Sequence, residues 1–542
     1  MKTILIILTC LFSFLSLAQN PPILWQKNIG GSGDDGLNRI EIQNSTDYFL
    51  IGNSDSDISG DKTENSRGFN DIWIIRLDQN HNILWDKTIG ASGYDIYHSS
   101  IVKNDTLFIV SFTSSPISGE KTLAPLNTDG TTDIWFLALD LSGNILWQKL
   151  YGGTEDDGGS FGNIIALPNN NLLIGINSRS GISGNKTEVN IGFDDFWLVE
   201  ISSTDGAVVN QNTIGSTGAD NIRQLFLSPN NSIIITGKAD QGSSGDKTDP
   251  GFGSSDIWLV EVDMNLNVLQ NKCFGGTDPE IQFDGSATIN YIDGFYYLIS
   301  HSSSAISGNK TAPKIGLRDY WFIKMDTNFN IIWDKTYGGS SFDYGSGIIK
   351  LGDNKLLLNG YSKSLPGSGT NGNKTSPRYG VFDAWLLIVD TLGNIIAQET
   401  YGGNQDDFIA PITNSVSGIV YLLCGSNSGI SGNKTVPTNG GSDAWLMEID
   451  ASGFLNTESI KGVNTTVSVY PNPTEGIVNV KFKDLEEDVT MTFYTVDGKV
   501  IHQENISTNS VKKEFNFSGT SQMVFYTIEG DRINYSGKIV IK

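Results

Sequence analysis

Short apolar runs separated by turn-forming residues follow one another along most of the chain. Within 23–78, the segment 39–42 alternates polar and apolar residues with the period of two that side chains have in a β-strand. The segment 48–52 is a continuous apolar run, typical of a strand buried on both faces, and 23–30 and 71–78 form two further strand-like runs. The stretch therefore predicts four short strands, and the chain shows no helical periodicity beyond its first residues.

One tripeptide, Asp-x-Trp, recurs through this pattern at steps of 60–64 residues between successive Trp residues. It occurs seven times, at Asp71 and Trp73, Asp133 and Trp135, Asp195 and Trp197, Asp256 and Trp258, Asp319 and Trp321, Asp383 and Trp385, and Asp443 and Trp445. Four strands in a repeat of ~62 residues predict an all-β fold, a seven-bladed β-propeller with four-stranded blades. We expect each Asp to accept backbone hydrogen bonds at a strand start and each Trp to pack between neighbouring blades.

Two loops recur with the same period as the tripeptide. A Ser-Gly-x-Lys-Thr loop precedes it, as at 59–63 and 183–187. A Gly-led turn also recurs, as Gly-Gly-x-x-Asp at 152–156 and 402–406, with looser copies at Gly90, Gly215, Gly275 and Gly338. Because connections between antiparallel strands alternate between the two ends of a sheet, both loops are expected on one face of the propeller. The lysines are expected to form structural Lys–Asp pairs there. This face has the longer loops and is the better candidate for binding.

The two ends of the repeat region predict how the ring closes. The strand 23–30 has no blade before it, and the last Asp-x-Trp strand, which ends at Asp450, has only a degenerate follower. We therefore expect the N-terminal strand to complete the seventh blade, formed by residues 405–450. The alternative is that 455–460 fills the place and 23–30 packs elsewhere.

The repeat unit resembles the bacterial propeller repeat known as the SBBP repeat. The similarity covers residues 23–453 and rests on the Ser-Gly loop, Asp-Ala-Trp-Leu at 383–386 and 443–446, and the Leu-Trp-x-Lys and Gly-Gly steps. It departs where that repeat often has Phe, since Trp stands at all seven places here. The resemblance implies a fold and no single activity.

The repeat stops after Asp450, and residues 467–542 form short alternating strands that predict a small Ig-like β-sandwich. This segment resembles the type A sorting domain of the type IX secretion system of Bacteroidetes. The resemblance rests on Tyr470-Pro471-Asn472-Pro473, the Asp497-Gly498-Lys499 turn and a Lys-rich end. It implies export through the outer membrane, removal of the domain, and a secreted or surface-attached product.

The N-terminus predicts a secretory signal peptide at 1–18. Lys2 supplies its positive start, 4–17 its apolar core, and cleavage is expected between Ala18 and Gln19. The domain prediction is therefore a signal peptide at 1–18, a propeller at 19–456, a linker at 457–466 and the sorting domain at 467–542. The expected partners are the Sec and type IX secretion machineries, and no segment of the sequence predicts a transmembrane span.

The net charge and the cysteine content of the chain limit the kinds of molecule that it is expected to bind. The 542 residues carry a formal net charge of −24, which favours solubility and repels nucleic acids and anionic lipids. A cation-binding role is the alternative interpretation of this acidity. Besides Cys10 in the leader there are two cysteines, Cys273 and Cys424, expected to be buried free thiols because two isolated cysteines make no disulfide framework.

Candidate chemistry is sparse. Asp55, Asp57 and Ser59 resemble the start of a calcium loop, although Ser66 replaces the bidentate Glu expected at its twelfth position. The four His residues do not cluster, and no nucleophile motif is present. The sequence therefore predicts no catalytic residue and no cofactor.

The function that the sequence favours is a non-catalytic, extracellular module that binds a protein or a glycan. The alternatives are a polysaccharide hydrolase or lyase with a site in the central channel, and a structural surface-layer component. An enzyme would show one blade with unmatched Asp, Glu, His or Arg side chains pointing inward. The fifth repeat, with Glu280 and Asp284 after Gly275-Gly276, is the one mild asymmetry that the sequence suggests.

Overall fold

A computed structural model describes most of the chain. It covers residues 21–541 except 43–46, 128–129, 241, 282–285, 368–371, 411–414, 417, 455–465, 471–473, 475, 484, 486, 496–498, 509, 518–522 and 531–533. The predicted signal peptide with Ala18 and Gln19, Asp284, nearly all of the predicted linker, and residues 471–473 and 497–498 of the sorting-domain motifs lie outside these described residues. The chain divides into two compact units, one ending at Ala451 and one spanning Ser452–Lys542.

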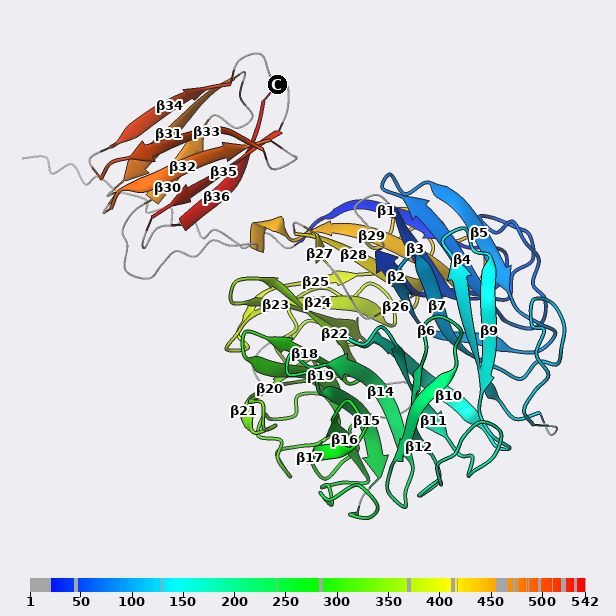
Figure 1. Ribbon diagram of the computed structural model, residues 1–542. Helices are drawn as coiled ribbons and strands as arrows, with labels where there is room; N and C mark the ends of the chain where they lie inside the picture. The colour runs from blue at the N-terminus through cyan, green and yellow to red at the C-terminus, as the bar shows by residue number, and fades with distance from the viewer. Residues whose placement is uncertain are drawn as a thin grey trace, which may run out of the picture. The chain divides into compact units, whose positions relative to one another are not determined.

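The first unit consists of seven antiparallel sheets (Figure 1). Three of them are β2 (Asp35–Ile42), β3 (Asp47–Ser54), β4 (Asp71–Asp78) and β5 (Ile83–Ile89); β6 (Asp95–Lys103), β7 (Thr106–Thr113), β8 (Asp133–Asp140) and β9 (Ile145–Tyr151); and β10 (Asp157–Ala166), β11 (Leu172–Ser178), β12 (Asp195–Ile201) and β13 (Val208–Ile214). The next are β14 (Asp220–Leu227), β15 (Ile233–Asp240), β16 (Ser255–Val262) and β17 (Val268–Phe274); β18 (Thr288–Ile292), β19 (Phe295–Ser302), β20 (Asp319–Met325) and β21 (Ile331–Tyr337); and β22 (Asp343–Gly352), β23 (Lys355–Ser362), β24 (Asp383–Asp390) and β25 (Ile395–Tyr401). The last sheet holds β26 (Asp407–Ile409), β27 (Ser415–Val416), β28 (Ile419–Ser426), β29 (Asp443–Asp450) and β1 (Ile23–Ile29).

The N-terminal strand occupies the outer position of the last sheet. β1 pairs antiparallel with β29, with Asn28 opposite Trp445 and Gln26 opposite Met447. The Asp450 N–H also donates to the carbonyl of Pro22 at 3.0 Å. The predicted pairing of the two ends of the repeat region is confirmed, and the alternative strand at 455–460 lies outside the described residues.

Neighbouring sheets pack in chain order around a common centre (Figure 1). In the first five sheets the first strand contacts the next sheet, the sixth sheet contacts the seventh through β23, β24 and β26, and the last sheet contacts the first through β28 and β2. Apolar cores lie between adjacent sheets: one contains Trp73, Leu50 and Leu446, from the first and last sheets. The prediction of an all-β fold built from repeated four-stranded antiparallel sheets is confirmed.

The second unit contains two antiparallel sheets that share one core. The unit begins with a short 3₁₀ helix, η2 (Ser452–Phe454). Its strands are β30 (Thr466–Tyr470), β31 (Ile477–Lys483) and β34 (Lys512–Asn516) in one sheet, and β33 (Val500–Ile506), β32 (Val489–Tyr494), β35 (Met523–Glu529) and β36 (Asn534–Val540) in the other. Val480 and Phe515 of the first sheet pack with Met491, Phe493 and Ile539 of the second.

Candidate ligand cavity and the sheet junctions

The seven Asp-x-Trp aspartates lie buried where a loop enters the third strand of its sheet. The carboxylate of Asp383 accepts the N–H of Tyr379 at 2.7 Å, four residues earlier. The same i−4 bond, at 2.5–2.8 Å, is made by Asp71, Asp195, Asp256, Asp319 and Asp443. Asp133 accepts from Leu126 at 2.9 Å. These carboxylates satisfy backbone donors that the loop would otherwise bury without a partner.

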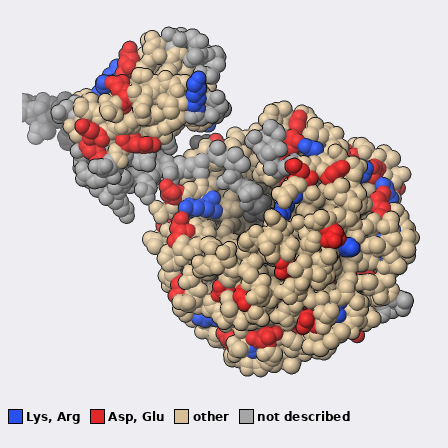
Figure 2. Space-filling model, in the orientation of Figure 1, with Lys and Arg blue, Asp and Glu red and all other residues tan. Residues whose placement is uncertain are grey.

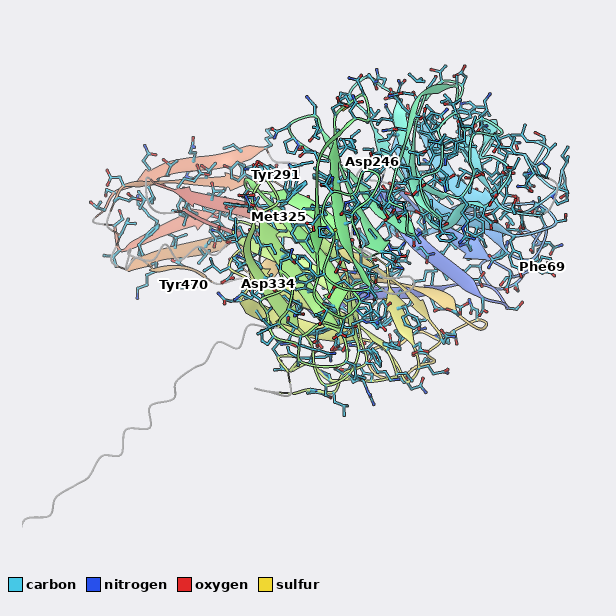
Figure 3. The ribbon with its side chains drawn as sticks, turned by 90° about the horizontal axis from the view of Figure 1, so that it is seen from below. Phe69, Asp246, Tyr291, Met325, Asp334 and Tyr470 are labelled. Carbon is cyan, nitrogen blue, oxygen red and sulfur yellow. The ribbon has the colours of Figure 1, made fainter. Side chains whose placement is uncertain are left out.

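The seven Trp side chains of the tripeptide have an exposed fraction of 0%. The indole N–H of Trp321 donates to Asp334 at 2.9 Å, and Asp334 also accepts the N–H of Thr311 from the Ser-Gly-x-Lys-Thr loop (Figure 3). The same two bonds recur at five other sheets, with Asp86, Gln148, Gln211, Asn271 and Gln26 as acceptors. One side chain of the outer strand therefore joins the tripeptide to the loop.

The loop lysines are buried, which the sequence did not predict. Lys62, Lys121, Lys186, Lys247, Lys310, Lys374 and Lys434 are each at most 2% exposed. Five ammonium groups lie 5.5–6.0 Å from the centre of a tripeptide indole. Within the described residues none is in an ion pair with Asp. Their ammonium groups donate hydrogen bonds to hydroxyls and carbonyls instead, as Lys121 does to the carbonyl of Ser115 at 2.9 Å. The prediction that these lysines form Lys–Asp pairs is therefore wrong.

The Gly-Gly-x-x-Asp turns place a second buried acid beside each tripeptide aspartate. Asp407 accepts the N–H of Gly403 at 2.7 Å and the hydroxyl of Ser428 at 2.8 Å. Burial raises the pKa values of several of these acids, and the neighbouring carboxylate adds to the rise. The pKa rises to about 6 for Asp133, Asp220 and Asp383, and to about 7 for Asp319 and Glu280.

Glu280 shows that the asymmetry of the fifth repeat is structural. Glu280 takes the place of the turn aspartate, accepts the N–H of Gly276 at 3.1 Å and the hydroxyl of Ser302 at 2.8 Å, and is fully buried. It is not among the described residues that line the cavity of the seven sheets. Its hydrogen bonds are those that the corresponding aspartate makes in the other repeats, so Glu280 has a structural role at this turn.

The calcium candidate has protein partners at two of its three residues. The Asp55 carboxylate accepts the N–H of Asp34 at 2.7 Å, and the hydroxyl of Ser59 accepts the N–H of Ser32 at 2.8 Å. The hydroxyl of Ser59 donates to the carbonyl of Asp57 at 2.9 Å. No group of three or more His, Cys, Asp or Glu side chains in the described residues could hold a metal ion. The calcium interpretation stays a prediction.

The loop face presents a repeated apolar feature. In six sheets the hydroxyl of the loop Ser contacts the Gly-Gly turn, so the two loops lie together, as the sequence suggests. An aliphatic side chain beside the loop Ser, or at the corresponding place, is 56–65% exposed at Ile58, Ile117, Ile182, Ile306, Leu365 and Ile430. Phe69 is 64% exposed nearby and stacks on Tyr94 with ring centres 5.1 Å apart (Figure 3).

A cavity of about 810 Å³ lies where the first strands of the sheets meet. All seven sheets contribute to its wall, with Arg39, His98, Asn163, Arg223, Asn290, Tyr344 and Phe408 as one residue from each. Its volume lies within the range of roughly 300–1,000 Å³ found for ligand pockets. It is therefore the candidate functional site.

β-Bulges set which side chains face the cavity. The pairing of the first strand with the second shifts by one residue at Asn38, His98, Arg223 and Ser346, and all four line the cavity. A bulge re-aims a side chain that the strand would otherwise direct elsewhere. This position lies three residues after the turn aspartate. An internal comparison of the repeats would have found it, because its neighbours stay similar while it changes from Asn to His, Arg and Ser.

The amides of the wall use their oxygens to join sheets. The Asn53 side-chain oxygen accepts the N–H of Tyr97 at 2.7 Å, and the Gln224 oxygen accepts the N–H of Ile289 at 2.7 Å. Asn163 accepts the N–H of Leu225 at 3.3 Å. Each bond joins a wall amide to an inner strand of another sheet. These amides therefore help to hold neighbouring sheets together at the wall.

Aromatic side chains gather at one side of the wall, on the sixth and seventh sheets. Tyr344 stacks on Tyr361 with ring centres 4.9 Å apart, and Tyr361 meets Phe408 edge-on at 5.1 Å. Phe408 is 41% exposed. The Arg318 guanidinium lies 5.1 Å from the Tyr344 ring centre and donates to its hydroxyl at 3.2 Å. The first sheet, which contacts the seventh, contributes Asn38 and Asn53 to the wall beside this cluster.

A buried histidine lies behind the aromatic cluster. The ring of His301 is 4.9 Å from that of Tyr344 and is fully buried. Burial, together with the nearby positive charges of Arg318 and Arg223, lowers the pKa of His301 to about 3. His301 is therefore neutral in the folded protein at physiological pH.

The remaining predictions concern the surface and the thiols. Cys273 and Cys424 are buried and free, as predicted. Figure 2 shows acidic side chains scattered with fewer basic ones over the visible face, without a large basic field. In the part of the chain that the structure describes, no helix is long and apolar enough to cross a membrane.

Comparison with known proteins identifies the C-terminal segment. Residues 468–542 match the family described as the secretion system C-terminal sorting domain. The tail therefore indicates export by the type IX machinery, to the cell surface or the extracellular space. No curated protein sequence matches the chain significantly.

Several solved structures are similar to the chain at low identity. Puromycin hydrolase is 9% identical with a TM-score of 0.39; the match covers 86% of this chain, which spans about 60% of the length of that protein. The endosialidase of phage phi92 is 11% identical with a TM-score of 0.38, covering 96% and 79% of the two chains. PorZ, a surface component of the type IX secretion system of Porphyromonas gingivalis, is 10% identical with a TM-score of 0.21, covering 94% and 75%.

Proposed function

We propose that this protein is a secreted or surface-attached seven-bladed β-propeller, built from SBBP-like repeats, that binds a ligand in its central cavity without transforming it. The leader 1–18, removed between Ala18 and Gln19, serves export by the Sec pathway. An Ig-like sandwich at 467–542 serves the type IX pathway. The observation that carries the proposal is the cavity of about 810 Å³, to which all seven sheets contribute side chains.

The chemistry of the wall supports binding over hydrolysis. The described residues that line the cavity include amides, two Arg, one His and several aromatic side chains, and no Asp or Glu among them. Glycoside hydrolysis ordinarily needs a pair of carboxylic acids on either side of the scissile bond. Asp35 and Asp343, which lie close in sequence to the wall, are fully buried and hold the Gly-Gly turns, and Glu41 is paired with Arg39 at 2.7 Å.

The experiment is a screen of the full chain against glycan and extracellular-protein panels, with product release followed in parallel. Saturable binding that is lost when Tyr361→Ala opens the aromatic side of the cavity, with no product formed, supports the proposal. Binding that survives this change and is lost on altering the exposed Ile58, Ile182 and Ile430 instead would move the site to the loop face.

A second candidate, a polysaccharide lyase, is favoured by one observation. His98 and Arg223 are unmatched in the other repeats and line the cavity, which is the asymmetry expected of an enzyme. An Arg beside a sugar carboxylate and a neutral His acting as base are the groups that proton abstraction next to a carboxylate requires. Release of shortened, unsaturated sugar products in the same screen would replace the binding proposal with this one.

A further inference from the structure

The charged side chains of the cavity wall are already engaged by the protein. The described residues that line the cavity include Arg39 and Arg223 and no Asp or Glu. Arg39 donates its Nε to Glu41 at 2.7 Å, so its charge is compensated within the first sheet. Arg223 is 9% exposed, donates to the carbonyl of Ile222 at 3.3 Å and interacts with further protein groups. An ion placed here would lose its hydration without meeting an uncompensated opposite charge, so an uncharged ligand fits this wall better.

One aromatic ring of the wall stays largely uncovered. Phe408 lines the cavity and is 41% exposed. Its ring meets that of Tyr361 edge-on at 5.1 Å and lies 5.5 Å from the ring of Phe382, so aromatic neighbours hold it in place. A ring that is fixed in a concave wall and remains accessible offers a flat apolar surface to a ligand.

The neighbouring first sheet leaves open space at the corresponding place. The residue directly after the turn acid is Phe408 in the seventh sheet, Tyr344 in the sixth and Gly36 in the first, which contacts the seventh. A side-chain carbon at Gly36 would have no protein atom within 4 Å. The backbone of Gly36 does not lie in the left-handed region either. Neither packing nor backbone conformation therefore requires glycine here, and its small size leaves room for a ligand beside the aromatic side of the wall.

Two amides of the wall have hydrogen-bonding groups that the protein does not use. Asn38 and Asn290 line the cavity from the first and the fifth sheet. Within the described residues, neither side chain makes a hydrogen bond to the protein. Each amide offers two N–H donors and one acceptor oxygen. The wall therefore suits a ligand whose groups both donate and accept hydrogen bonds.

The inner strands do not present a regular edge for a peptide. Their pairing with the second strand shifts at a bulge in the first, second, fourth and sixth sheets, at residues that line the cavity. A peptide that adds to a sheet as a further strand needs an unbroken row of backbone donors and acceptors. Recognition by wall side chains is therefore favoured over the addition of a peptide strand.

We propose that the cavity binds an uncharged saccharide, a neutral sugar chain with one ring lying against Phe408 in the space beside Gly36 and with hydroxyls bonded to wall amides such as Asn38 and Asn290. A pyranose ring has an apolar C–H face and a rim of hydroxyls that both donate and accept. It therefore matches one exposed aromatic ring among unused amides. This inference rests on the proposed function and names the chemical class of its ligand.

The test measures dissociation constants of the full chain for a panel of oligosaccharides. The neutral members are malto-, cello-, xylo- and manno-oligosaccharides, and the charged members are oligogalacturonate and chondroitin sulfate fragments. At least one neutral member is expected to bind, with an affinity about tenfold or more above every charged member. Because no ion pair forms, its dissociation constant should change less than about twofold when salt is raised.

Variants place the sugar in the cavity. Phe408→Ala removes the exposed ring and is expected to weaken binding about tenfold or more, whereas Phe408→Tyr keeps the ring and should retain it. Phe193→Ala, the same loss of a ring at a position that is 73% exposed and outside the described wall, is the matched control with no effect.

Gly36→Leu tests the open space from the other side. The added side chain occupies the space that the sugar ring needs, so binding should weaken about tenfold or more. It meets no protein atom at its first carbon, so the melting temperature should stay that of the unchanged protein. The melting temperature of every variant is measured first, and Gly36→Leu with Phe408→Tyr carries the test if Phe408→Ala unfolds.

The outcomes separate this inference from the proposed function. A charged oligosaccharide that binds as tightly as every neutral one would overturn the uncharged class and leave the proposed function standing. So would binding of an extracellular protein, and of no saccharide, that is lost in Gly36→Leu. Neutral-sugar binding that survives both Phe408→Ala and Gly36→Leu would place the site outside the cavity and overturn both proposals.

Discussion

At the sheet junctions one arrangement recurs seven times, whereas one position on the cavity wall carries Asn38, His98, Arg223 and Ser346 in four different sheets. The junction side chains are buried, and most of them form hydrogen bonds within the protein. The wall side chains border the cavity. Junction residues, whose partners lie within the protein, stay similar between repeats, whereas residues that face the cavity differ. The junctions therefore stabilise the fold, and the wall determines which ligand can bind.

Among changes at the sheet junctions, we expect the largest loss of stability when β1, the strand that closes the ring of sheets, is removed. Deleting residues 21–30 exposes the edge of β29 and removes Gln26, the hydrogen-bond acceptor of Trp445. We expect the first unit to lose its cooperative unfolding transition, because the last sheet then lacks its outer strand. Calorimetry compares this variant with a chain that lacks only 1–20. A cooperative transition within a few degrees of the control would show that the ring does not depend on β1.

A single junction side chain gives the next largest effect. Trp321→Ala empties a fully buried site between the fourth and fifth sheets, and we expect a loss of about 3–5 kcal/mol in the free energy of unfolding. Phe193→Ala, at a position that is 73% exposed, serves as control with a change within about 0.5 kcal/mol. Denaturant titration measures both. Similar losses in the two variants would refute the role of the tripeptide Trp in joining sheets.

The junction acids predict a dependence of stability on pH. The pKa of Asp383 is raised to about 6 by burial, with Asp407 adding to the rise. A raised folded pKa contributes stability that is present below about pH 4 and is lost as pH rises through about 6. Asp133, Asp220, Asp319 and Glu280 act in the same direction, so we expect the melting temperature to fall between pH 5 and pH 7.5.

Two substitutions separate charge from hydrogen bonding at this acid. Asp383→Ala leaves the N–H groups of Tyr379 and Gly380 without an acceptor and is expected to cost about 1–3 kcal/mol. Asp383→Asn keeps an acceptor, so it should cost less and should flatten the pH dependence. A steeper dependence in Asp383→Asn than in the unchanged protein would contradict the assignment of the raised pKa to this site.

The repeat architecture could be predicted from the sequence because each of the seven repeats needs the same residue types at the same positions. Each third strand needs an acid to hold its incoming loop and a large ring to fill the space to the next sheet, so Asp71 and Trp73 have counterparts at even steps. Even the closure by β1 followed, since a lone strand at one end matched a missing strand at the other.

The burial of the loop lysines and the cavity wall could not be predicted in this way. Lys374 looks like a surface residue in its polar loop, and only the path of the loop over Trp385 buries it. The wall depends on bulges that shift pairing by one residue, and the sequence around His98 or Arg223 carries no signal for that shift until the repeats are compared with one another. The sequence distinguishes the fifth repeat by Glu280 and Asp284, and Glu280 replaces an aspartate that is structural in the other repeats.

A substitution on the cavity wall is expected to have the smallest effect on stability. Asn290 lines the cavity on β18, and no hydrogen bond described above depends on its side chain. Asn290→Ala is expected to change the free energy of unfolding by no more than about 0.5 kcal/mol, because it creates no buried cavity and removes no acceptor of a buried N–H. The same variant should lower the affinity for a bound saccharide severalfold. A loss of stability as large as that of Asp383→Ala would show that the wall residue stabilises the fold. The distinction between stabilising junction residues and ligand-binding wall residues would then be wrong.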